Sequence, residues 1–580
     1  MPQDPLSSSV CLPGALDLES ILRETPRRHV IRERLLEQYG TEAKAVTAIT
    51  KRPYETILDL DGAGWQSADA VGKAVGIADD APDRLRAAIL EVMRQQETWG
   101  HCWHSPQGLL AQTRAMVGIQ SRPIMKAIQR GVDKGWIHAE AEDRLYFPKL
   151  HGAETRLIDA IARIRAAEIQ DKMGLPQEGE EIPGLYQDQT EALWSIGCQP
   201  LSIITGPPGS GKTYMLRALL DRFTGNVELM APTGRAAKRM TESTGRQAST
   251  IHRALKPRKI NGKFQFCRDE VAPDLLVVDE ASMLSLSLAA ALLSRVKTGT
   301  RVVLIGDPHQ LPAVGPGDVL RDLLRSKMIG GADLTEIKRQ EDRGIVAACQ
   351  RILQGGMPDL PRPGEADLAF IRCRSDVETA QAARDLLANH AMRAKYGAED
   401  DYQGIQVITP RRKPGSATSA TTFNERLWRA SHGRGDHPHP QPGDKVMQTK
   451  NSYELGLMNG DIGRVVDVVG HGRARDLTVD FGEDVGEVSA RESKFALDFA
   501  WATTTHKAQG SEWPVTILMM HESAGGFLLN RCLFYTALSR AQRLCVVVGS
   551  ESAIRTAVMN DREERRRTGL AERLWRRLCG

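Results

Sequence analysis

The hydrophobic residues of this chain follow two different patterns along its length. Through about the first 180 residues they recur at helical spacing, as Val30, Ile31, Leu35, Leu36 and Tyr39 do. From about residue 185 onward, short apolar runs are each followed by a loop and a helical stretch, which predicts parallel sheets covered by helices on both faces. The runs form two sets, and so two α/β nucleotide-fold domains are expected: Leu201–Thr205, Val227–Ala231, Leu275–Asp279 and Val302–Gly306, then Ile405–Thr409, Val515–Met519 and Leu544–Gly549.

Two further stretches have the features of antiparallel strands. Between residue 443 and about residue 495, the strand-like segments Gly463–Val469 and Asp476–Phe481 lie among Gly- and Asn-containing turns. Short strands of this kind predict a small antiparallel barrel inserted in the second α/β domain. Lys259–Phe266 predicts a compact hairpin, because its central Asn261-Gly262 pair fits a type I′ turn.

The helical N-terminal region contains one turn of functional interest. Gly62-Ala63-Gly64 separates the helical stretches Tyr54–Asp61 and Trp65–Val75. A Gly-containing turn between helices can direct backbone amides at a phosphate, as helix–hairpin–helix DNA-binding proteins do, but most such turns only connect helices. Ala63 is small for the apolar position in such a hairpin, so DNA binding and simple packing both stay open.

Length, charge and cysteine usage bound the class of protein. At 580 residues the chain is too long for a single core, and several domains are expected. The net charge of +4 produces no global basic field, so any nucleic-acid binding has to come from a local groove. Nine cysteines without a CxxC pair argue against a zinc ribbon and for a reducing compartment. A polar N-terminus and the lack of an apolar run of about 18 residues predict a cytoplasmic protein with no membrane partner.

The most informative segment joins a predicted strand to a predicted helix. Gly206-Pro207-Pro208-Gly209-Ser210-Gly211-Lys212-Thr213 follows the run Leu201–Thr205 and opens the helical stretch Tyr214–Phe223. In this context the glycines let backbone N–H groups close around phosphate oxygens, and the helix N-terminus adds a favourable dipole. Lys212 is expected to reach the β- and γ-phosphates of a nucleotide such as ATP, and Thr213 to bind Mg²⁺. The segment predicts nucleotide hydrolysis; the alternative is a chance Gly-rich turn.

Two carboxylates at the end of a later strand form the expected second half of this site. Asp279 and Glu280 follow the apolar run that begins at Leu275, and ligands bind at the carboxyl edge of parallel sheets. Asp279 is expected to hold Mg²⁺ through water, and Glu280 to orient and activate the attacking water. The alternative is a buried strand with a charged end. Gln310, after the next strand, is a neutral side chain that could sense the γ-phosphate.

In their order along the chain, these segments resemble the motifs of superfamily-one helicases. The motifs of the first α/β domain are Gln189, Gly206–Thr213, Ala231–Ala237, Thr250–His252, Asp279–Met283, Gly306–Pro312 and Leu334–Gln340. Those of the second are Gly443–Gln448, Asn459–Asp461, Thr504–Glu512 and Tyr535–Ala541. Their details are most similar to the RecD-like branch. The N-terminal region resembles that of stand-alone RecD-like helicases through Arg52-Pro53-Tyr54, Gly62-x-Gly64, Ala68-Asp69 and Gly100-His101.

The resemblance implies an α/β fold with two RecA-like P-loop NTPase domains, a helical N-terminal region and a small inserted β-barrel. The implied domains are a helical, helix–hairpin–helix-like region (1–100), a small winged-helix-like module and linker (101–180, with the linker near Gln177–Pro183), a first RecA-like domain (181–335) that carries a pin hairpin (257–270), and a second RecA-like domain (336–580) with the barrel at about 440–497.

The resemblance also implies roles for individual residues. Gln189 would read adenine, and Arg339 and Arg540 would reach the γ-phosphate from the second domain and act in catalysis with Lys212, Glu280 and Gln310. A further set would line the track for single-stranded DNA without reading sequence: Thr233, Thr250, His252, Thr504, His506 and Lys507. Phe264 lies on the hairpin that would split the duplex.

The implied function is an ATP-dependent DNA helicase that moves 5′→3′ on single-stranded DNA and unwinds tailed duplexes in repair, recombination or replication. One alternative is a single-strand translocase, or a motor subunit of a larger recombination complex that unwinds poorly without partner proteins. Another is a regulatory nucleotide switch without motor activity, against which Arg339, Arg540 and the Thr504–Glu512 motif argue. The sequence leaves open RNA as a substrate, the pathway, the preferred DNA structure and the oligomeric state.

Two other groups of residues were considered for binding. His101-Cys102-Trp103-His104 fits no common zinc spacing, so a metal site there is not expected. Arg562–Arg567 is a basic cluster near the C-terminus, and it is interpreted either as a solvated helix face or as a contact with DNA.

Overall fold

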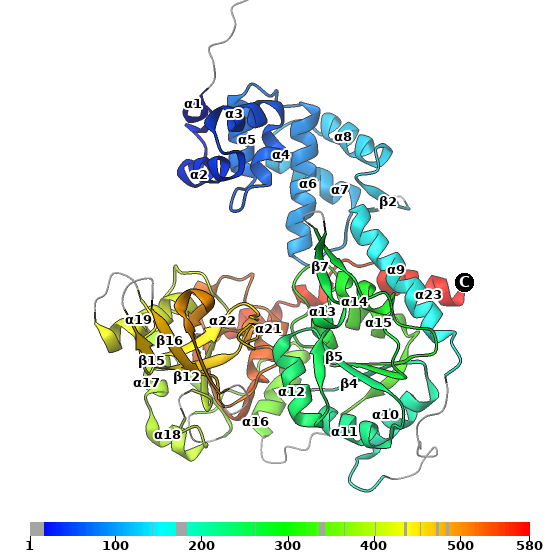
Figure 1. The fold of residues 1–580 in the computed structure, drawn as a ribbon, viewed down its shortest axis with the longest axis vertical. Helices are drawn as coiled ribbons and strands as arrows, with labels where there is room; N and C mark the ends of the chain where they lie inside the picture. Colours follow the sequence, from blue (N-terminus) through cyan, green and yellow to red (C-terminus); the bar gives the residue numbers. More distant parts are fainter. Residues whose placement is uncertain are drawn as a thin grey trace, which may run out of the picture. The chain divides into compact units, whose positions relative to one another are not determined.

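The computed structural model consists of two compact units, Met1–Gly152 and Ala153–Gly580 (Figure 1). The residues it describes are 17–141, 143–169, 182–260, 263–335, 343–362, 364, 366–400, 402–433, 438–452, 454–470, 475–482 and 486–580. Arg339, the Asn261-Gly262 turn and most of the predicted linker Gln177–Pro183 lie outside these ranges. Within them, no helix combines the length and the apolar character that a bilayer-crossing segment requires.

The first unit consists of helices and one small sheet. Its helices are α1 (Leu18–Leu22), α2 (Arg28–Tyr39), α3 (Glu42–Lys51), α4 (Pro53–Leu58), α5 (Trp65–Ala74), α6 (Pro82–Thr98), α7 (Pro106–Val117) and α8 (Ser121–Asp133). The strands β1 (Trp103–His104), β2 (His138–Glu140) and β3 (Arg144–Tyr146) pair antiparallel in the order β1-β3-β2. The helical spacing predicted at Val30–Tyr39 is confirmed as α2, with Ile31 and Leu35 buried, whereas Val30 is exposed.

A buried polar cluster joins the two helices on either side of the Gly62–Gly64 turn to α6. Arg84 on α6 is 1% exposed, and its guanidinium donates to both carboxylate oxygens of Asp69 on α5, at 2.7 and 3.0 Å. Tyr54 on α4 donates to the same carboxylate at 3.3 Å and stacks on Trp65 at the start of α5. Tyr54 and Asp69 belong to the segments in which the N-terminal region resembles stand-alone RecD-like helicases. Some of the residues behind that resemblance therefore hold these helices together.

The second unit begins within α9 (Pro148–Arg165) and contains two parallel sheets. The first sheet, in residues 182–335 (the first sheet domain), has the strand order β11-β4-β10-β9-β5-β6, and all its pairs are parallel. Its strands are β4 (Leu201–Thr205), β5 (Val227–Ala231), β6 (Ala248–Thr250), β9 (Leu275–Val278), β10 (Arg301–Gly306) and β11 (Gly330–Asp333). Its helices are α10 (Gln187–Cys198), α11 (Lys212–Arg222), α12 (Gly234–Thr244), α13 (Ile251–Ala254), α14 (Leu286–Leu293) and α15 (Val319–Ser326), with the 3₁₀ turn η1 (Ala281–Met283).

The central strands of this sheet are buried along their whole length. Every residue of β4, β9 and β10 is buried, as expected where helices cover both faces of a parallel sheet. The apolar runs of the sequence therefore become the core, and the polar residues that follow each run gather at one edge. Gly306 pairs with Thr205, and Leu304 with Val278, so the loops that begin at residues 206, 279 and 307 leave the sheet side by side.

A second parallel sheet, in residues 343–559 (the second sheet domain), has the order β12-β21-β20-β13-β19. Its strands are β12 (Leu368–Arg372), β13 (Ile405–Thr409), β19 (Ala502–Thr504), β20 (Trp513–Met520) and β21 (Ala541–Gly549). Its helices are α16 (Arg343–Leu353), α17 (Asp376–Leu387), α18 (His390–Lys395), α19 (Ala420–His432), α20 (Thr505–Ala508), α21 (Arg531–Leu538) and α22 (Glu551–Met559), with the 3₁₀ turn η4 (Glu522–Ala524). The prediction of two parallel α/β sheets is confirmed.

An antiparallel sheet is inserted between α19 and β19. Its strand order is β17-β16-β15-β14-β18, and Val446, Val465, Leu477 and Val479 form its core. Its elements are β14 (Lys445–Gln448), β15 (Ile462–Val469), β16 (Asp476–Asp480), β17 (Glu487–Arg491), β18 (Leu497–Phe499) and the 3₁₀ turn η3 (Glu492–Lys494). In the first sheet domain, β7 (Pro257–Ile260) and β8 (Lys263–Phe266) form the antiparallel hairpin that the sequence predicted.

After the second sheet domain, the last residues of the chain return to the first sheet domain. This C-terminal strap (residues 560–580) contains η5 (Arg562–Arg565) and α23 (Leu570–Cys579), and α23 packs against α15. Arg566 is 8% exposed in its side chain, and its guanidinium donates to the carbonyl oxygens of Ala313, Gly315 and Gly317 at 2.9–3.0 Å. Both interpretations of the basic cluster were therefore wrong for Arg566, because a buried guanidinium that crosslinks two segments faces neither solvent nor DNA.

Asp322, on α15, is a buried acid whose protonation affects stability. Burial, with Asp318 and Glu154 nearby, raises the pKa of Asp322 to about 8, although Thr568 donates to its Oδ1 at 2.8 Å. Between about pH 4 and pH 8 the folded protein therefore holds a proton that the unfolded chain releases, so this group's contribution to the free energy of unfolding falls as the pH rises.

Replacing Asp322 with Asn, which resembles the protonated acid and can still accept from Thr568, is expected to raise the melting temperature. The gain over the parent protein should grow between pH 6 and pH 9 and reach a few degrees at pH 9. Differential scanning calorimetry of both proteins at several pH values measures this difference. A gain that is the same at every pH would contradict the predicted titration of Asp322.

Candidate active site

The phosphate loop leaves β4 and leads into α11. Gly209 and Gly211 have positive φ values of 84° and 79°, and Gly211 is the N-cap of α11 without a side-chain cap. Lys212 folds back over the loop, and its Nζ donates to the carbonyl oxygens of Gly206 at 2.6 Å and Pro207 at 2.9 Å. The loop thus presents uncapped helix N–H groups and an ammonium group at one point, which is the arrangement that phosphate oxygens require.

Close packing explains why the loop needs glycine at two positions. A Cβ on Gly206 would lie 2.5 Å from Ser210 Oγ, and a Cβ on Gly211 would lie 2.4 Å from Gln189 Nε2. Ser210 Oγ is buried and lacks a hydrogen-bond partner among the described residues, so its O–H can donate to an oxygen of a bound phosphate. Gln189, predicted to read adenine, is buried beneath the loop, where its Nε2 donates to Ser210 O at 3.2 Å and its Oε1 accepts from Tyr186 N–H.

Asp279 and Glu280 follow β9 at the same edge of the sheet. Burial, together with the neighbouring Glu280, raises the pKa of Asp279 to about 6, while Lys212 and Arg239 lower it. Glu280 has a positive φ of 53°, which is uncommon for a residue with a side chain, and its N–H donates to Asp279 Oδ1 at 2.8 Å. Two adjacent carboxylates at the carboxyl edge of the sheet favour cation binding, and this fits Mg²⁺.

The loop after β10 is hydrogen-bonded to the second sheet domain. Gln310 Nε2 donates to Asp307 Oδ2 at 3.3 Å, and Tyr535 Oη on α21 donates to the same oxygen at 2.8 Å. Leu311 N–H donates to Thr536 Oγ1 at 2.8 Å, and its carbonyl oxygen accepts from Gln509 Nε2 at 2.8 Å. The predicted γ-phosphate sensor therefore lies in a loop that touches α21 directly.

Arg540, the predicted γ-phosphate contact from the second sheet domain, is 1% exposed. Its guanidinium donates to the carbonyl oxygens of Thr536 and Ser511 at 3.1 and 3.2 Å and to Ser539 Oγ at 3.0 Å. In this structure its donors are thus directed at its own domain. Arg339, the second predicted arginine, lies outside the described residues.

A cavity of about 450 Å³ separates the phosphate loop from the second sheet domain. Its walls include Gly206, Pro207 and Asp307 from one domain and Tyr535 and Ser539 from the other. A ligand bound to the phosphate loop would therefore face α21 across this space, with Asp307 from the loop of Gln310 in the same wall.

The three threonines predicted to contact DNA share one structural role. Each lies at or just after the carboxyl end of a parallel strand and caps the next helix: Thr233 Oγ1 accepts from Ala236 N–H, Thr250 Oγ1 from Arg253 N–H and Thr504 Oγ1 from Lys507 N–H. A hydroxyl that accepts as a cap keeps its own O–H as a donor. These threonines can therefore order their helices and still donate to a phosphate.

The other predicted DNA contacts differ in their surroundings. His252 is exposed and lies near Phe266 of the hairpin, with ring centroids 5.8 Å apart, and His506 is exposed on α20. Lys507 pairs with Asp498 at 3.2 Å, and Arg412 pairs with the same carboxylate at 2.8 Å, beside a cavity of about 450 Å³. Phe264 lies on β8, and its side chain is outside the described part of the chain.

In the first unit, a larger cavity lies beside the Gly62–Gly64 turn. It has a volume of about 1380 Å³, and its lining includes Arg27, Trp65 and Lys73 as well as the two glycines. A Cβ at Gly62 or Gly64 would meet nothing within 4 Å, so the tip of the turn is open. The turn is therefore accessible, while Trp65 beside it packs on Tyr54.

The sequence matches four described families along its length. These are an AAA domain (184–381), the HHH domain of the ATP-dependent RecD2 DNA helicase (28–103), the SH3 domain of the ATP-dependent RecD-like DNA helicase (424–481) and the C-terminal domain of UvrD-like helicases (499–548). The ATP-dependent RecD2 DNA helicase of Deinococcus radiodurans is 33% identical over 570 residues, which cover 93% of this chain and 75% of that protein. The chain belongs to the RecD2-like helicases.

Other relatives extend the comparison. The RecBCD enzyme subunit RecD of Mycolicibacterium smegmatis is 30% identical over 74% of this chain and 82% of its own length. Among solved structures, the Pif1 helicase of Candida albicans aligns with 65% of this chain and 96% of its own, at a TM-score of 0.38 and 20% identity. As a RecD2-like helicase, the protein is an ATP-dependent DNA helicase with a nucleotide-binding core.

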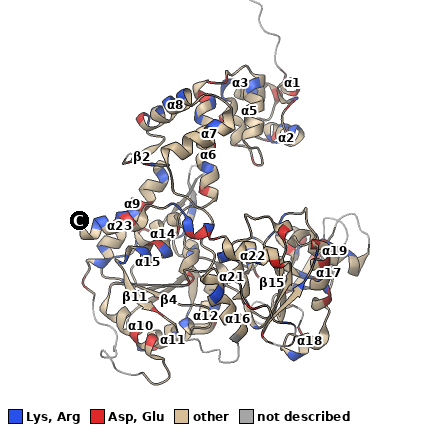
Figure 2. Ribbon diagram, turned by 180° about the vertical axis from the view of Figure 1, so that it is seen from behind, with Lys and Arg blue, Asp and Glu red and all other residues tan. Residues whose placement is uncertain are grey.

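Positive and negative charges are mixed along the chain of this RecD2-like helicase. Figure 2 shows basic and acidic residues interspersed on the helices of both units, in keeping with a net charge of only +4. Affinity for a polyanion then depends on where individual cations lie, as with Lys507 and Arg412 beside their cavity.

Residue-level reasoning on the sequence missed the polar contacts that join the two sheet domains. Tyr535 and Thr536 are buried on α21, an otherwise largely apolar helix, and both contact the loop at residues 307–311. Their signal was present in the sequence, since a buried Tyr and Thr need hydrogen-bond partners. Arg235 on α12 donates to Ser511, a further link between the domains; both residues lie in motifs, but their contact was not predicted.

Proposed function

We propose that this RecD2-like helicase moves 5′→3′ on single-stranded DNA and unwinds duplexes that carry a 5′ tail. The direction is supported by membership of the RecD2-like family. The structural observation that carries the proposal is the direct contact between the loop at residues 307–311 and α21, because it lets nucleotide binding in one sheet domain move the other. Such motion would shift the contacts on a bound strand.

The residues at the sheet edge fit ATP with Mg²⁺. The phosphate loop, Gly206 to Thr213, would hold the phosphates, with Lys212 on the β- and γ-phosphates. Thr213 and Asp279 would hold Mg²⁺, which would neutralise charge on the phosphate oxygens. Gln189 would read adenine once its amide is released from Ser210 and Tyr186, which it contacts here.

The hydrolysis step would use residues from both sheet domains. The Glu280 carboxylate would take a proton from a water as the water oxygen attacks the γ-phosphorus and the bond to the β-phosphate oxygen breaks. Gln310 would orient that water, and Lys212, Arg540 and Arg339 would stabilise the charge on the transferring phosphoryl group. Arg540 would have to leave its contacts with Thr536 and Ser511 as the cavity closes, so hydrolysis would require domain closure.

The strand would lie across the carboxyl edges of the two sheets. Thr233, Thr250 and His252 would hold phosphates on the first sheet domain, and Thr504, His506 and Lys507 on the second. The β7–β8 hairpin, through Phe264, would separate the duplex, and the inserted sheet would close as a small barrel over the strand. The domain division inferred from the sequence, at residues 100, 180 and 335, remains our proposal.

We further propose that the helicase acts in DNA repair or recombination, with partner proteins that bind the same DNA. The likeness to the RecBCD enzyme subunit RecD supports this role and keeps the alternative of a motor that unwinds weakly alone. DNA binding by the open Gly62–Gly64 turn belongs to the same proposal, and the cavity beside the turn supports it.

Unwinding of two partial duplexes, one with a 5′ tail and one with a 3′ tail, tests the proposed direction. We expect strand separation of the 5′-tailed substrate alone in the presence of ATP and Mg²⁺. Lys212→Ala, which removes the ammonium group from the phosphate loop, should abolish it. The measurement is the release of a labelled strand, followed over time.

Two results would change the proposal. Preference for the 3′ tail would contradict the assigned direction. ATP hydrolysis that single strands stimulate, without release of the labelled strand, would support the alternative of a translocase that depends on a partner.

A further inference from the structure

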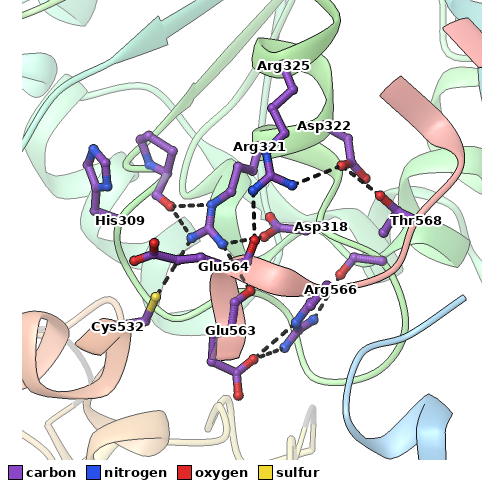
Figure 3. A network of polar contacts seen from close by, with 12 residues as sticks. His309, Asp318, Arg321, Asp322, Arg325, Cys532, Glu563, Glu564, Arg566 and Thr568 are labelled. Carbon is purple, nitrogen blue, oxygen red and sulfur yellow. Dashed lines mark hydrogen bonds and ion pairs between the residues drawn. The ribbon is translucent and has the colours of Figure 1, made fainter. Parts of the chain in front are cut away.

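Arg321 is a buried cation outside the sequence motifs, and it joins three segments of the second unit. It lies on α15 and is 9% exposed. Its Nε and Nη2 donate to Pro308 O at 3.2 and 2.5 Å, and its Nη1 donates to Glu563 O at 3.1 Å. Its Nη2 also lies 3.8 Å from Cys532 Sγ on α21. Figure 3 shows the guanidinium at the centre of this network.

The charge of Arg321 is compensated from its own helix. Asp318, the N-cap residue of α15, places Oδ2 2.9 Å from Arg321 Nη1 and is itself buried. This pair leaves Nε and Nη2 of the planar guanidinium free to donate together to a single carbonyl oxygen, that of Pro308. Lys, with one ammonium group, could keep the ion pair with Asp318 but could not form that double contact.

The carbonyl that Arg321 grips belongs to the loop of the predicted γ-phosphate sensor. Pro308 lies between Asp307, which accepts from Tyr535 Oη, and Gln310, whose amide donates to Asp307. The loop is therefore held from the α15 side by Arg321 and from the α21 side by Tyr535 and Thr536.

The C-terminal strap holds the same region from a third side. Arg566 donates to the carbonyl oxygens of Ala313, Gly315 and Gly317, which follow the loop directly. Glu563 accepts from Arg321 through its main chain and pairs with Arg566 at 2.8 Å. Loop, helix α21 and strap thus meet at one guanidinium.

We propose that Arg321 is a positioning residue for ATP hydrolysis. By fixing Pro308 O against α21 and the strap, it sets the place of Gln310 in the cleft as α21 approaches with Arg540. The proposal rests on the proposed roles of Gln310 and Arg540. Arg321 itself makes no contact with the reacting atoms, because its guanidinium faces main-chain oxygens, the Asp318 carboxylate and Cys532.

The test is the steady-state ATPase of Arg321→Gln at saturating single-stranded DNA. We expect kcat to fall between about tenfold and 10²-fold, because small misplacements of a positioning group have effects of that size. KM for ATP and the affinity for DNA should stay within about twofold, since the phosphate loop and the strand track are untouched. The matched control is Arg325→Gln, one turn further along α15, because Arg325 donates to Glu564 O at 2.7 Å in the same strap without touching Pro308. Its kcat should be close to that of the parent protein.

A double-mutant cycle separates positioning from a merely structural role. In a Gln310→Ala background, Arg321→Gln should lower kcat by less than about twofold, because the group it positions is already gone. If Gln310→Ala lowers kcat and Arg321→Gln multiplies that loss in full, the proposal for Arg321 is overturned while the role of Gln310 stands. If Gln310→Ala alone leaves kcat unchanged, the proposed role of Gln310 fails, and the proposal for Arg321 fails with it.

Arg321→Lys keeps the test valid if Arg321→Gln does not fold. Lys retains the pair with Asp318 and loses the double contact with Pro308 O. We expect a thermal unfolding transition near that of the parent protein together with a reduced kcat. A parent-like kcat in a folded Arg321→Lys protein would overturn the proposal.

Discussion

Replacing Glu280 with Gln is expected to give a helicase that binds ATP and DNA but hydrolyses ATP about 10²–10⁴-fold more slowly. Glu280 is the second residue after β9 and has a positive φ, and its neighbour Asp279 accepts its N–H, so the carboxylate is held at the sheet edge beside the phosphate loop. An amide of the same shape keeps this backbone and the local packing, but it cannot take a proton from water. Steady-state release of phosphate with single-stranded DNA measures the loss.

The matched control is Glu191→Gln on α10 of the same sheet domain. Glu191 is exposed and accepts from Gln187 at 2.9 Å, a contact that a Gln side chain can keep. Its ATPase activity should equal that of the parent protein. Binding of a labelled, slowly hydrolysed ATP analogue should be retained in both variants. A Glu280→Gln protein with parent-like turnover would show that another group activates the water.

Arg540→Ala should lower kcat by about 10³-fold, with DNA affinity nearly unchanged. An arginine that reaches the transferring phosphoryl group contributes about 10³–10⁵ in kcat in related phosphoryl transfers, and the lower end is expected here because Arg339 is proposed to share the role. In this structure the guanidinium instead contacts Thr536, Ser511 and Ser539 of its own domain. A loss of activity in Arg540→Ala would therefore indicate a closed state, different from the structure described, in which Arg540 reaches the phosphoryl group.

Two variants show whether the loss of activity in Arg540→Ala comes from catalysis or only from a disturbed fold. Arg543→Ala, on the same strand β21, removes an exposed arginine that donates to Tyr396 O, and its turnover should not change. Arg540→Lys keeps the positive charge in the buried position but not the planar fork, so it should fold and still lose most of its activity. If Arg540→Ala unfolds at a lower temperature while its kcat per folded molecule is retained, Arg540 is an anchor of α21 only.

Much of the core could be predicted because its strands are buried on both faces. Leu201–Thr205, Val227–Ala231 and Ile405–Thr409 have the bounds that the apolar runs gave. β10 and β21 begin earlier than predicted, because their first residues include the polar Arg301 and Gln542-Arg543, which the apolar runs left out. Arg301 is 3% exposed and donates to Gly197 O. A buried charged residue therefore belongs to the strand, although a prediction from apolar residues alone excludes it.

The candidate site was predictable to the extent that its chemistry is local. Asp279 and Glu280 follow β9, the loop that carries Lys212 follows β4, and parallel strands bring their carboxyl ends together whatever the rest of the chain does. The contacts of Arg321 and Arg566 had no such signal, because both side chains bind main-chain carbonyl oxygens of distant segments. Every residue has a carbonyl oxygen, so no pattern in the sequence marks the ones that are chosen.

The course of the C-terminal strap limits how the two sheet domains can move. The chain passes from the first to the second sheet domain between β11 and α16, and it returns at residues 560–569 to α15 and the loop beside it. Two bodies joined at one point can swing in any direction, whereas two bodies joined at two points rotate about the line through both. As long as the strap stays bound, the domain motion that we propose for ATP binding and release would be a rotation about one fixed axis, like that of a door on two hinges.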